Sequence, residues 1–249
     1  MKEIFAVINQ KGGVGKSTTA LALAAGLTAR GFKTLLIDLD AQGNLSYSAG
    51  ADTSGRTAFD MLSEIFAGDA IRSHELYDLI PAASELATAD LVFSTTGKEY
   101  RLREALEPLL SSYDYIVLDT PPALGILTVN ALTAATAAII PAQADVYSLQ
   151  GIGQLYSTLD AIKKYTNPEL TVSGILLTRY NPRSILTRDM SELLEETANQ
   201  LGTRVFDAKI REVVAVREAQ AARTDLFTYA PKSNASLDYA SFIDELLDT

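Results

Sequence analysis

The sequence predicts a three-layer, doubly wound α/β fold, in which a mostly parallel sheet carries helices on both faces. Short apolar runs recur along the chain and are separated by longer segments with helical periodicity, which is the βαβ pattern of a parallel sheet. The runs lack polar alternation, as expected of strands that helices cover on both sides. They lie at residues 3–9, 33–38, 115–119, 137–141 and 172–178.

Composition limits the class of protein. The chain has 249 residues, of which 47% are hydrophobic and 21% charged, enough apolar material for a single domain over residues 1–249. No apolar run approaches the roughly 18 residues of a membrane span, and the chain opens on a strand rather than a signal peptide, so we expect a cytoplasmic protein. Without cysteine there is no disulfide, thiolate zinc site or cysteine-ligated iron–sulfur cluster. A net charge of -10 means that any contact with nucleic acid must be focal.

A glycine-rich segment follows the first predicted strand and precedes an Ala- and Leu-rich helix predicted at residues 19–30. Its glycines let backbone N–H groups face phosphate oxygens, and the helix N-terminus adds its dipole. Lys16 supplies a charge to the β- and γ-phosphates, the Ser17 hydroxyl is placed to ligate magnesium, and Thr18 can donate to a phosphate. The alternative is a turn that merely lets strand and helix pack closely, but the Gly-Lys-Ser-Thr ending in this strand–loop–helix context favours a phosphate site.

The spacing departs from the standard phosphate-loop pattern at its start. The first glycine of G-x-x-x-x-G-K-[ST] would fall at Gln10, and Lys11 comes next, either as an exposed loop lysine or as a second cation for the phosphates. Residues 9–18 resemble the deviant Walker A box of the ParA/Soj/MinD ATPases. The resemblance implies that Lys11 reaches the partner's phosphates in an ATP-dependent homodimer, and that Lys11 and Lys16 both act in catalysis. It implies ATP and Mg²⁺ as cofactors, contacted by Lys11, Gly12, Gly13, Val14, Gly15, Lys16, Ser17 and Thr18.

Two carboxylates end the second predicted strand, at the sheet edge where nucleotides bind in open α/β folds. The alternate spacing of Asp38 and Asp40 on an extended chain points them to opposite sides, so we expect different roles. The segment resembles the switch I box V-D-x-D-P-Q-G-N, which implies that Asp40 positions or polarises the attacking water and that Asp38 supports the site or the metal. Ala41 replaces the usual proline and could loosen this switch. Asp40 as a simple turn cap before Gln42 is the alternative.

A third carboxylate, Asp119, ends the strand predicted at residues 115–119 and is followed by Thr-Pro-Pro. An aspartate in this place is the Walker B position, which holds magnesium, usually through water. The resemblance makes this D-T-P-P segment switch II. The predicted metal site therefore consists of Ser17, Asp38 and Asp119.

Segments later in the chain extend the resemblance. Residues 140–145, 174–181, 210–212 and 218–219 occur in family-like order and spacing, and together favour ParA over a generic phosphate-loop protein. The resemblance places Asn181 and Pro182 in the loop that recognises adenine.

The resemblance also implies binding of nonspecific double-stranded DNA through basic residues in the C-terminal half. Such contacts go to backbone phosphates and are strongly salt-sensitive. Arg183 matches a DNA-contacting arginine of Soj-like members, whereas Ala215 occupies the other usual arginine position. A solvated charge or a salt-bridge partner is the alternative for each one. The candidates are Arg183, Arg188, Arg211, Arg217 and Arg223, with Lys209 and Lys232 as weaker ones.

We therefore expect a nucleoid-associated, DNA-partitioning ATPase, which a ParB-like partner stimulates to hydrolyse ATP and leave DNA. Positioning of a membrane or protein cargo in the manner of MinD is an alternative, although the helix predicted at residues 236–247 is acidic at its end and is no basic amphipathic anchor. A dethiobiotin-synthetase-like ligase is a further alternative, which the switch I segment disfavours. A nitrogenase-like reductase is excluded by the lack of cysteine.

Overall fold

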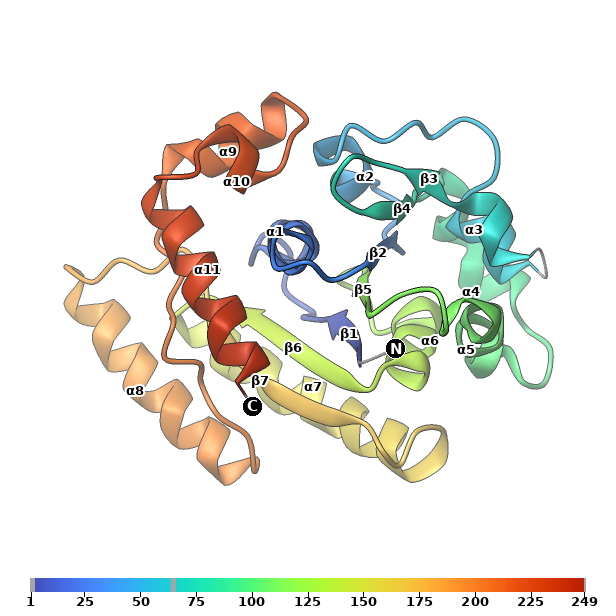
Figure 1. Cartoon of the computed structure of the whole chain (residues 1–249). Coiled ribbons are helices and arrows are strands. Elements are labelled where there is room, and N and C mark those ends of the chain that lie inside the picture. Colours follow the sequence, from blue (N-terminus) through green and yellow to red (C-terminus); the bar gives the residue numbers. More distant parts are fainter. Residues whose placement is uncertain (1–2, 64–65, 249) are drawn as a thin grey trace.

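The computed structural model describes residues 3–63 and 66–248 and contains a seven-stranded sheet (Figure 1). The strand order is β3-β4-β2-β5-β1-β6-β7, and every pair is parallel except β3 with β4. The predicted α/β fold with a mostly parallel sheet is confirmed. The strands are β1 (Glu3–Val7), β2 (Thr34–Asp38), β3 (Arg72–Ser73), β4 (Asp78–Ile80), β5 (Tyr115–Asp119), β6 (Ala137–Ala142) and β7 (Thr171–Leu177).

Helices cover both faces of this sheet (Figure 1). Four short 3₁₀ helices, η1 (Ala67–Ala70), η2 (Ser84–Thr88), η3 (Lys98–Tyr100) and η4 (Glu107–Leu109), lie between β2 and β5 in the chain. The α-helices are α1 (Lys16–Ala29), α2 (Asn44–Ser48), α3 (Ala58–Leu62), α4 (Ala89–Val92), α5 (Arg101–Leu106), α6 (Ile126–Ala134), α7 (Val146–Tyr165), α8 (Ile185–Gln200), α9 (Val214–Ala221), α10 (Leu226–Tyr229) and α11 (Asn234–Leu247).

The core is split into two layers because successive strand residues point to opposite faces. On β1, Ile4 and Ala6 pack with the layer of α5, α6 and α7, whereas Phe5 and Val7 pack with α1 and α11. Both sets are fully or almost fully buried, which explains why these strands lack polar alternation. The two layers hold β1 in the middle of the sheet, between β5 and β6.

The last helix, α11, lies directly on α1. A Cβ atom at Gly26 of α1 would fall 2.2 Å from Ile243 Cδ1, so any other residue there would require the Ile243 side chain to shift. The Tyr239 hydroxyl lies 3.1 Å from Thr19 Oγ1 and joins the two helices by a buried hydrogen bond. The apolar face of α11 is therefore used inside the fold. Within the described residues, no helix is both long and apolar enough to cross a membrane.

The observed elements differ from the predicted ones mainly at their ends. Helix α1 begins three residues before the predicted start at position 19, because Gly15 takes a left-handed conformation (φ 90°) and accepts the first helical hydrogen bond, from Thr19. Strand β1 ends at Val7, and the Asn9 side chain instead donates to the Pro141 carbonyl at 2.7 Å. The strands β3 and β4 have two and three residues, too few for a periodic pattern to reveal them.

Candidate functional site

A cavity of about 720 Å³ opens at the carboxyl edge of the sheet, a volume suited to a nucleotide-sized ligand. Three neighbouring strands, in the order β2-β5-β1, end there. One wall consists of the loop between β1 and α1. The opposite wall consists of residues 210–213 and helix α9. The cavity is also lined by helix α2 and by the segment predicted as switch I, residues 38–44.

The loop after β1 is shaped to present backbone donors. Gly13 and Gly15 both have positive φ (75° and 90°), which residues with a Cβ rarely adopt. The Gln143 amide donates to the Gly13 carbonyl at 3.3 Å, and the Thr178 hydroxyl donates to the Val14 carbonyl at 2.7 Å. By contrast, no backbone N–H of residues 12–17 donates a hydrogen bond to any described residue. Side chains from the loops after β6 and β7 thus bind the Gly13 and Val14 carbonyl groups, whereas the N–H groups of the loop are available to bind an anion.

Lys16 lies at the bottom of this loop, and its side chain is almost completely buried. Burial lowers the pKa of Lys16, and the carboxylates of Asp119 and Asp40 act against this shift. Its Nζ is 3.5 Å from the Lys11 carbonyl oxygen. A buried cation that faces two acids and a ring of N–H groups is suited to phosphate oxygens.

Lys11 points away from the cavity in this structure. It forms an ion pair with Asp145 at the N-terminus of α7, and its Nζ lies 3.5 Å from Gln143 Oε1 and 5.9 Å from the centre of the Tyr147 ring. The same Asp145 carboxylate caps α7 by accepting a hydrogen bond from the Ser148 N–H at 2.9 Å. To reach a phosphate, Lys11 must first leave Asp145. Its action across a dimer stays a prediction.

Asp38 and Asp119 are register partners on β2 and β5, and both are completely buried. Asp38 accepts hydrogen bonds from the Ser46 N–H at 2.8 Å, the Ser46 hydroxyl at 2.7 Å and the Asp40 N–H at 3.1 Å. Burial raises the pKa of Asp38 to about 6, although these hydrogen bonds oppose the shift. Asp38 thus anchors switch I at both of its ends, through a partner, Ser46, that sequence reasoning missed. Direct metal ligation by Asp38 stays a prediction.

Asp119 has no such partners. Both of its carboxylate oxygens are buried without a hydrogen bond of normal geometry to any described residue. The pKa of Asp119 is raised well above its usual value, mainly by burial and also by the negative charge of the neighbouring Asp38. The nearby Ser17 hydroxyl and Lys16 act in the opposite direction and lower this pKa. A buried acid without partners next to a hydroxyl is a fitting donor set for a hard divalent cation. Ser17 and Asp119 therefore fit the predicted magnesium.

We expect replacement of Asp119 by asparagine to stabilise the nucleotide-free protein. The amide removes a buried negative charge that lies beside another acid, so the free energy of unfolding should rise by on the order of 1–3 kcal/mol. The extra stability that magnesium and nucleotide confer should shrink at the same time, because a metal ligand is lost. Thermal unfolding with and without Mg·ADP measures both effects.

The matched control is Asp160→Asn on the exposed side of α7, which should change neither quantity. If nucleotide-free Asp119→Asn is less stable than the wild type, the prediction is wrong, and the buried carboxylate stabilises the fold through its interactions.

Asp40 combines the two roles that the sequence left open. Its Oδ1 accepts a hydrogen bond from the Gln42 N–H at 3.0 Å, which is the turn-capping bond. Its side chain also lines the cavity together with Lys16 and Ser17. Asp40 is only half-buried, whereas Asp38 is inaccessible, so the two acids have different surroundings, as their spacing predicted.

The wall opposite the phosphate loop differs from the one that the sequence suggested. Asn181 and Pro182 do not line the cavity, whereas Ile210, Glu212 and Val213 do. This segment is tied to the sheet because the Ile210 N–H donates to the Leu177 carbonyl at 2.8 Å. No local pattern in the sequence marked residues 210–213 as cavity wall. The contact of Asn181 and Pro182 with adenine stays a prediction.

The five predicted DNA-binding arginines lie in different surroundings. Arg183 and Arg188 are exposed and have no side-chain partner among the described residues. Arg211 lines the cavity in an ion pair with Asp238 at 2.6 Å, and the Arg223 guanidinium lies 4.4 Å from the centre of the Tyr47 ring. Arg217 also lines the cavity. The weaker candidate Lys209 is 3.5 Å from Glu195.

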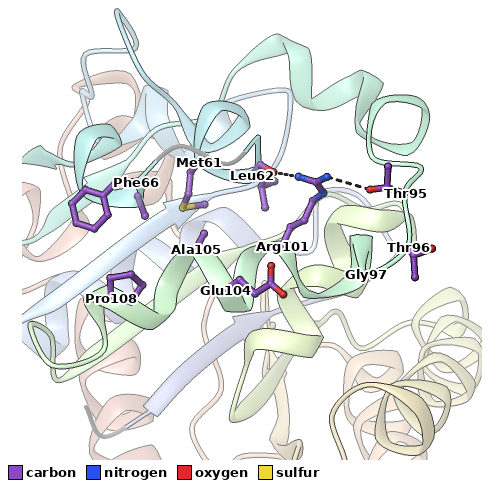
Figure 2. A pocket seen from close by; sticks show the side chains of 11 residues that line it. Met61, Leu62, Phe66, Thr95, Thr96, Gly97, Arg101, Glu104, Ala105 and Pro108 are labelled. Atoms are coloured by element: carbon purple, nitrogen blue, oxygen red, sulfur yellow. Dashed lines mark hydrogen bonds between the residues drawn. The ribbon is translucent and has the colours of Figure 1, made fainter.

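Another cavity, of about 400 Å³, lies between α3 and α5 (Figure 2). Its most prominent polar group is Arg101, which donates to the Leu62 carbonyl at 3.0 Å and to Thr95 Oγ1 at 3.3 Å. The guanidinium also lies 5.0 Å from the centre of the Phe93 ring. No residue of the phosphate loop or of the acidic strand ends lines this cavity, so it is separate from the site described above.

A phosphate loop between β1 and α1, an acid at the end of β5 and a switch segment after β2 define a P-loop nucleoside triphosphatase. Residues 2–172 match a family described as AAA domain. The chain is 36% identical over 252 residues to the sporulation initiation inhibitor protein Soj of Bacillus subtilis, covering 99% of this chain and 98% of Soj. It is 37% identical over 252 residues to the chromosome partitioning protein ParA of Caulobacter vibrioides, covering 98% and 93%. The chain belongs to the ParA/Soj family of P-loop ATPases.

A solved structure shares the whole fold. It is described as cobyrinic acid a,c-diamide synthase of Mycobacterium smegmatis with bound ADP and magnesium. The match has a TM-score of 0.86 and 34% sequence identity, and it covers 99% of this chain and 94% of the other. The predicted membership of the ParA/MinD superfamily is thus confirmed by sequence and by fold.

Proposed function

We propose that this protein is a DNA-partitioning ATPase of one domain, which dimerises when it binds ATP and holds nonspecific double-stranded DNA in the cytoplasm, at the nucleoid. A ParB-like partner stimulates hydrolysis and so releases the protein from DNA. The observation that carries the proposal is that Lys16, Ser17 and Asp40 line one nucleotide-sized cavity, with Asp119 buried close enough to act on the charge of Lys16. The printed names of the relatives, Soj and ParA, support the choice of DNA as cargo.

The residues of the cavity divide the work of hydrolysis. Lys16 and the N–H groups of residues 12–17 are placed to hold the phosphates. Ser17 and Asp119 would hold magnesium, which would supply positive charge to the phosphates. Asp40 orients the attacking water and accepts its proton. Its backbone is fixed through Asp38 and Ser46, so the carboxylate is held at the cavity.

Hydrolysis by the free protein should be slow. Lys11 is bound to Asp145 and contributes no charge to the cavity in this structure. Phosphoryl transfer depends on cations that stabilise the charge of the transition state. A partner that moves α7, or a second protomer that attracts Lys11, would supply the missing cation.

Of the predicted DNA-binding arginines, Arg183 and Arg188 at the start of α8 best fit a contact with DNA phosphates. Both are exposed, and neither side chain is engaged in an ion pair with a described residue. The net charge of -10 repels DNA, so binding requires a local group of positive side chains. Two unpaired arginines at one end of a helix form such a group.

Charge reversal at both positions, Arg183→Glu with Arg188→Glu, should lower DNA affinity at least about 10-fold at moderate salt and flatten the dependence on salt. ATP-dependent dimerisation should be unchanged. DNA retention across a salt series, with sedimentation in parallel, measures both. Reversal of Arg72, which donates to the Ser54 and Arg56 carbonyls, is the control on another surface. An unchanged DNA affinity would remove α8 from the interface.

The decisive experiment compares the purified protein with ADP, with ATP, and with ATP at raised salt. ATP-dependent dimers that retain nonspecific DNA and lose it in salt support the proposal. Dimers that ignore DNA would favour a protein or membrane cargo. Turnover that responds to cobyrinic acid and not to DNA would favour an enzyme of the kind named in the Mycobacterium smegmatis structure. Helix α11 gives no support to a membrane anchor, because its apolar face is packed on α1.

A further inference from the structure

The cavity contains four cationic side chains, and three of them are already engaged. Arg179 donates to Glu212 at 2.8 Å, and Arg211 donates to Asp238 at 2.6 Å. Lys16 is buried opposite Asp119 and Asp40. Arg217 is the fourth, and its side chain has neither a hydrogen bond nor an ion pair with any described residue. One guanidinium at the cavity therefore has no partner within residues 3–63 and 66–248, the part of the chain that the structure describes.

Helix α9 places Arg217 relative to the phosphate loop. Its face toward the cavity presents Val213, Val216, Arg217 and Gln220, the spacing of one side of a helix. The Gln220 side-chain amide donates to Thr18 Oγ1 at 3.0 Å and so fixes the C-terminal part of α9 against the start of α1. Arg217 lies three residues, or about 4.5 Å along the helix axis, before Gln220 on the same face. It thus faces the stretch of cavity between the phosphate loop and the wall at residues 210–213.

A nucleotide whose terminal phosphates are bound at Lys16 would extend along the cavity, and the apolar side chains of Ile210 and Val213 would then suit its base. The part that passes Arg217 is then the phosphate next to the sugar, together with the sugar itself. A guanidinium binds phosphate oxygens through paired N–H donors, and a partner-free arginine loses no existing contact in doing so.

We propose that Arg217 binds the phosphate nearest the sugar of the bound nucleotide and is not part of the DNA surface. This inference rests on the proposed ATPase function. It reassigns a residue for which the sequence had suggested DNA contact. Helix α9 would then contact the phosphate loop and the ligand at once. Gln220 binds Thr18, and Arg217 binds the nucleotide.

The test measures binding of fluorescent ADP and ATP to the full chain with magnesium. Arg217→Ala should weaken both by about 10-fold or more, and by the same factor, because both nucleotides carry the phosphate next to the sugar. Arg217→Lys keeps the charge but loses the paired donors, so it should lie between the wild type and Arg217→Ala. Thermal unfolding without nucleotide should be unchanged, because Arg217 has no partner to lose.

Arg103→Ala is the matched control, an exposed arginine of α5 outside the cavity and outside the proposed DNA surface, and it should leave nucleotide affinity unchanged. Equal affinity of the wild type and Arg217→Ala for both nucleotides would overturn the inference and leave the proposed function intact. Loss of DNA binding by Arg217→Ala at saturating ATP, with normal nucleotide affinity, would return Arg217 to the DNA surface. A wild-type protein that binds neither nucleotide would instead refute the proposed function itself.

Discussion

Replacing Lys16 with alanine should abolish nucleotide binding at working concentrations, lowering the affinity for Mg·ATP by on the order of 100- to 1,000-fold. Lys16 is the one cation buried among the phosphate-facing N–H groups, and the acids Asp119 and Asp40 depend on it for balance. Without it, the terminal phosphates would meet the carboxylates of Asp40 and Asp119 with no lysine between them. Equilibrium binding of a fluorescent ATP analogue measures the loss.

The control for this experiment is Lys163→Ala, which removes an exposed lysine near the end of α7. It should bind ATP like the wild type. Because removal of a buried charge can also affect folding, circular dichroism should confirm that Lys16→Ala keeps its secondary structure. A folded Lys16→Ala protein that still binds ATP tightly would refute the assignment of the phosphate site.

Replacing Asp40 should separate nucleotide binding from hydrolysis. With Asp40→Ala, turnover should fall at least about 100-fold, the usual contribution of a positioned general base, while ATP remains bound. The protein should then stay in its ATP state and, on the proposed function, remain on DNA. Single-turnover hydrolysis and DNA retention together measure this outcome.

Asparagine at position 40 distinguishes the two roles of the side chain. The amide oxygen of Asp40→Asn can still accept the hydrogen bond from the Gln42 N–H, but it cannot take a proton from water. If Asp40 handles the water, asparagine should be as inactive as alanine. Normal turnover in the asparagine variant would mean that Asp40 only shapes the turn.

The sequence predicted the part of the site that depends on neighbouring residues in the chain. The segment from Lys11 to Thr18 includes the glycine-rich turn, the two lysines and the start of α1, so its role could be predicted from adjacent residues alone. Asp119 ends strand β5, as predicted. The strands could be recognised because five of them are continuous apolar runs between helical segments.

The remaining parts of the site depend on contacts between distant segments. Ser46 binds Asp38 across seven intervening residues, and nothing in the sequence marks that serine among its neighbours. The wall at residues 210–213 joins the cavity only because Ile210 bonds to the end of β7. Whether Arg217 faces the ligand or the solvent likewise depends on the packing of α9 against α1, through Gln220 and Thr18.

The central position of β1 has a consequence for the order of events during synthesis on the ribosome. Glu3–Val7 emerges long before its two neighbours in the sheet, which begin only at Tyr115 and Ala137. Until β5 and β6 emerge, the strand that precedes the phosphate loop has no neighbouring strand to pair with. Pairing between segments so far apart in the chain is slow. Helix α1 gains its cover from α11 later still. A nascent chain should therefore be unable to capture nucleotide until α11 has left the exit tunnel.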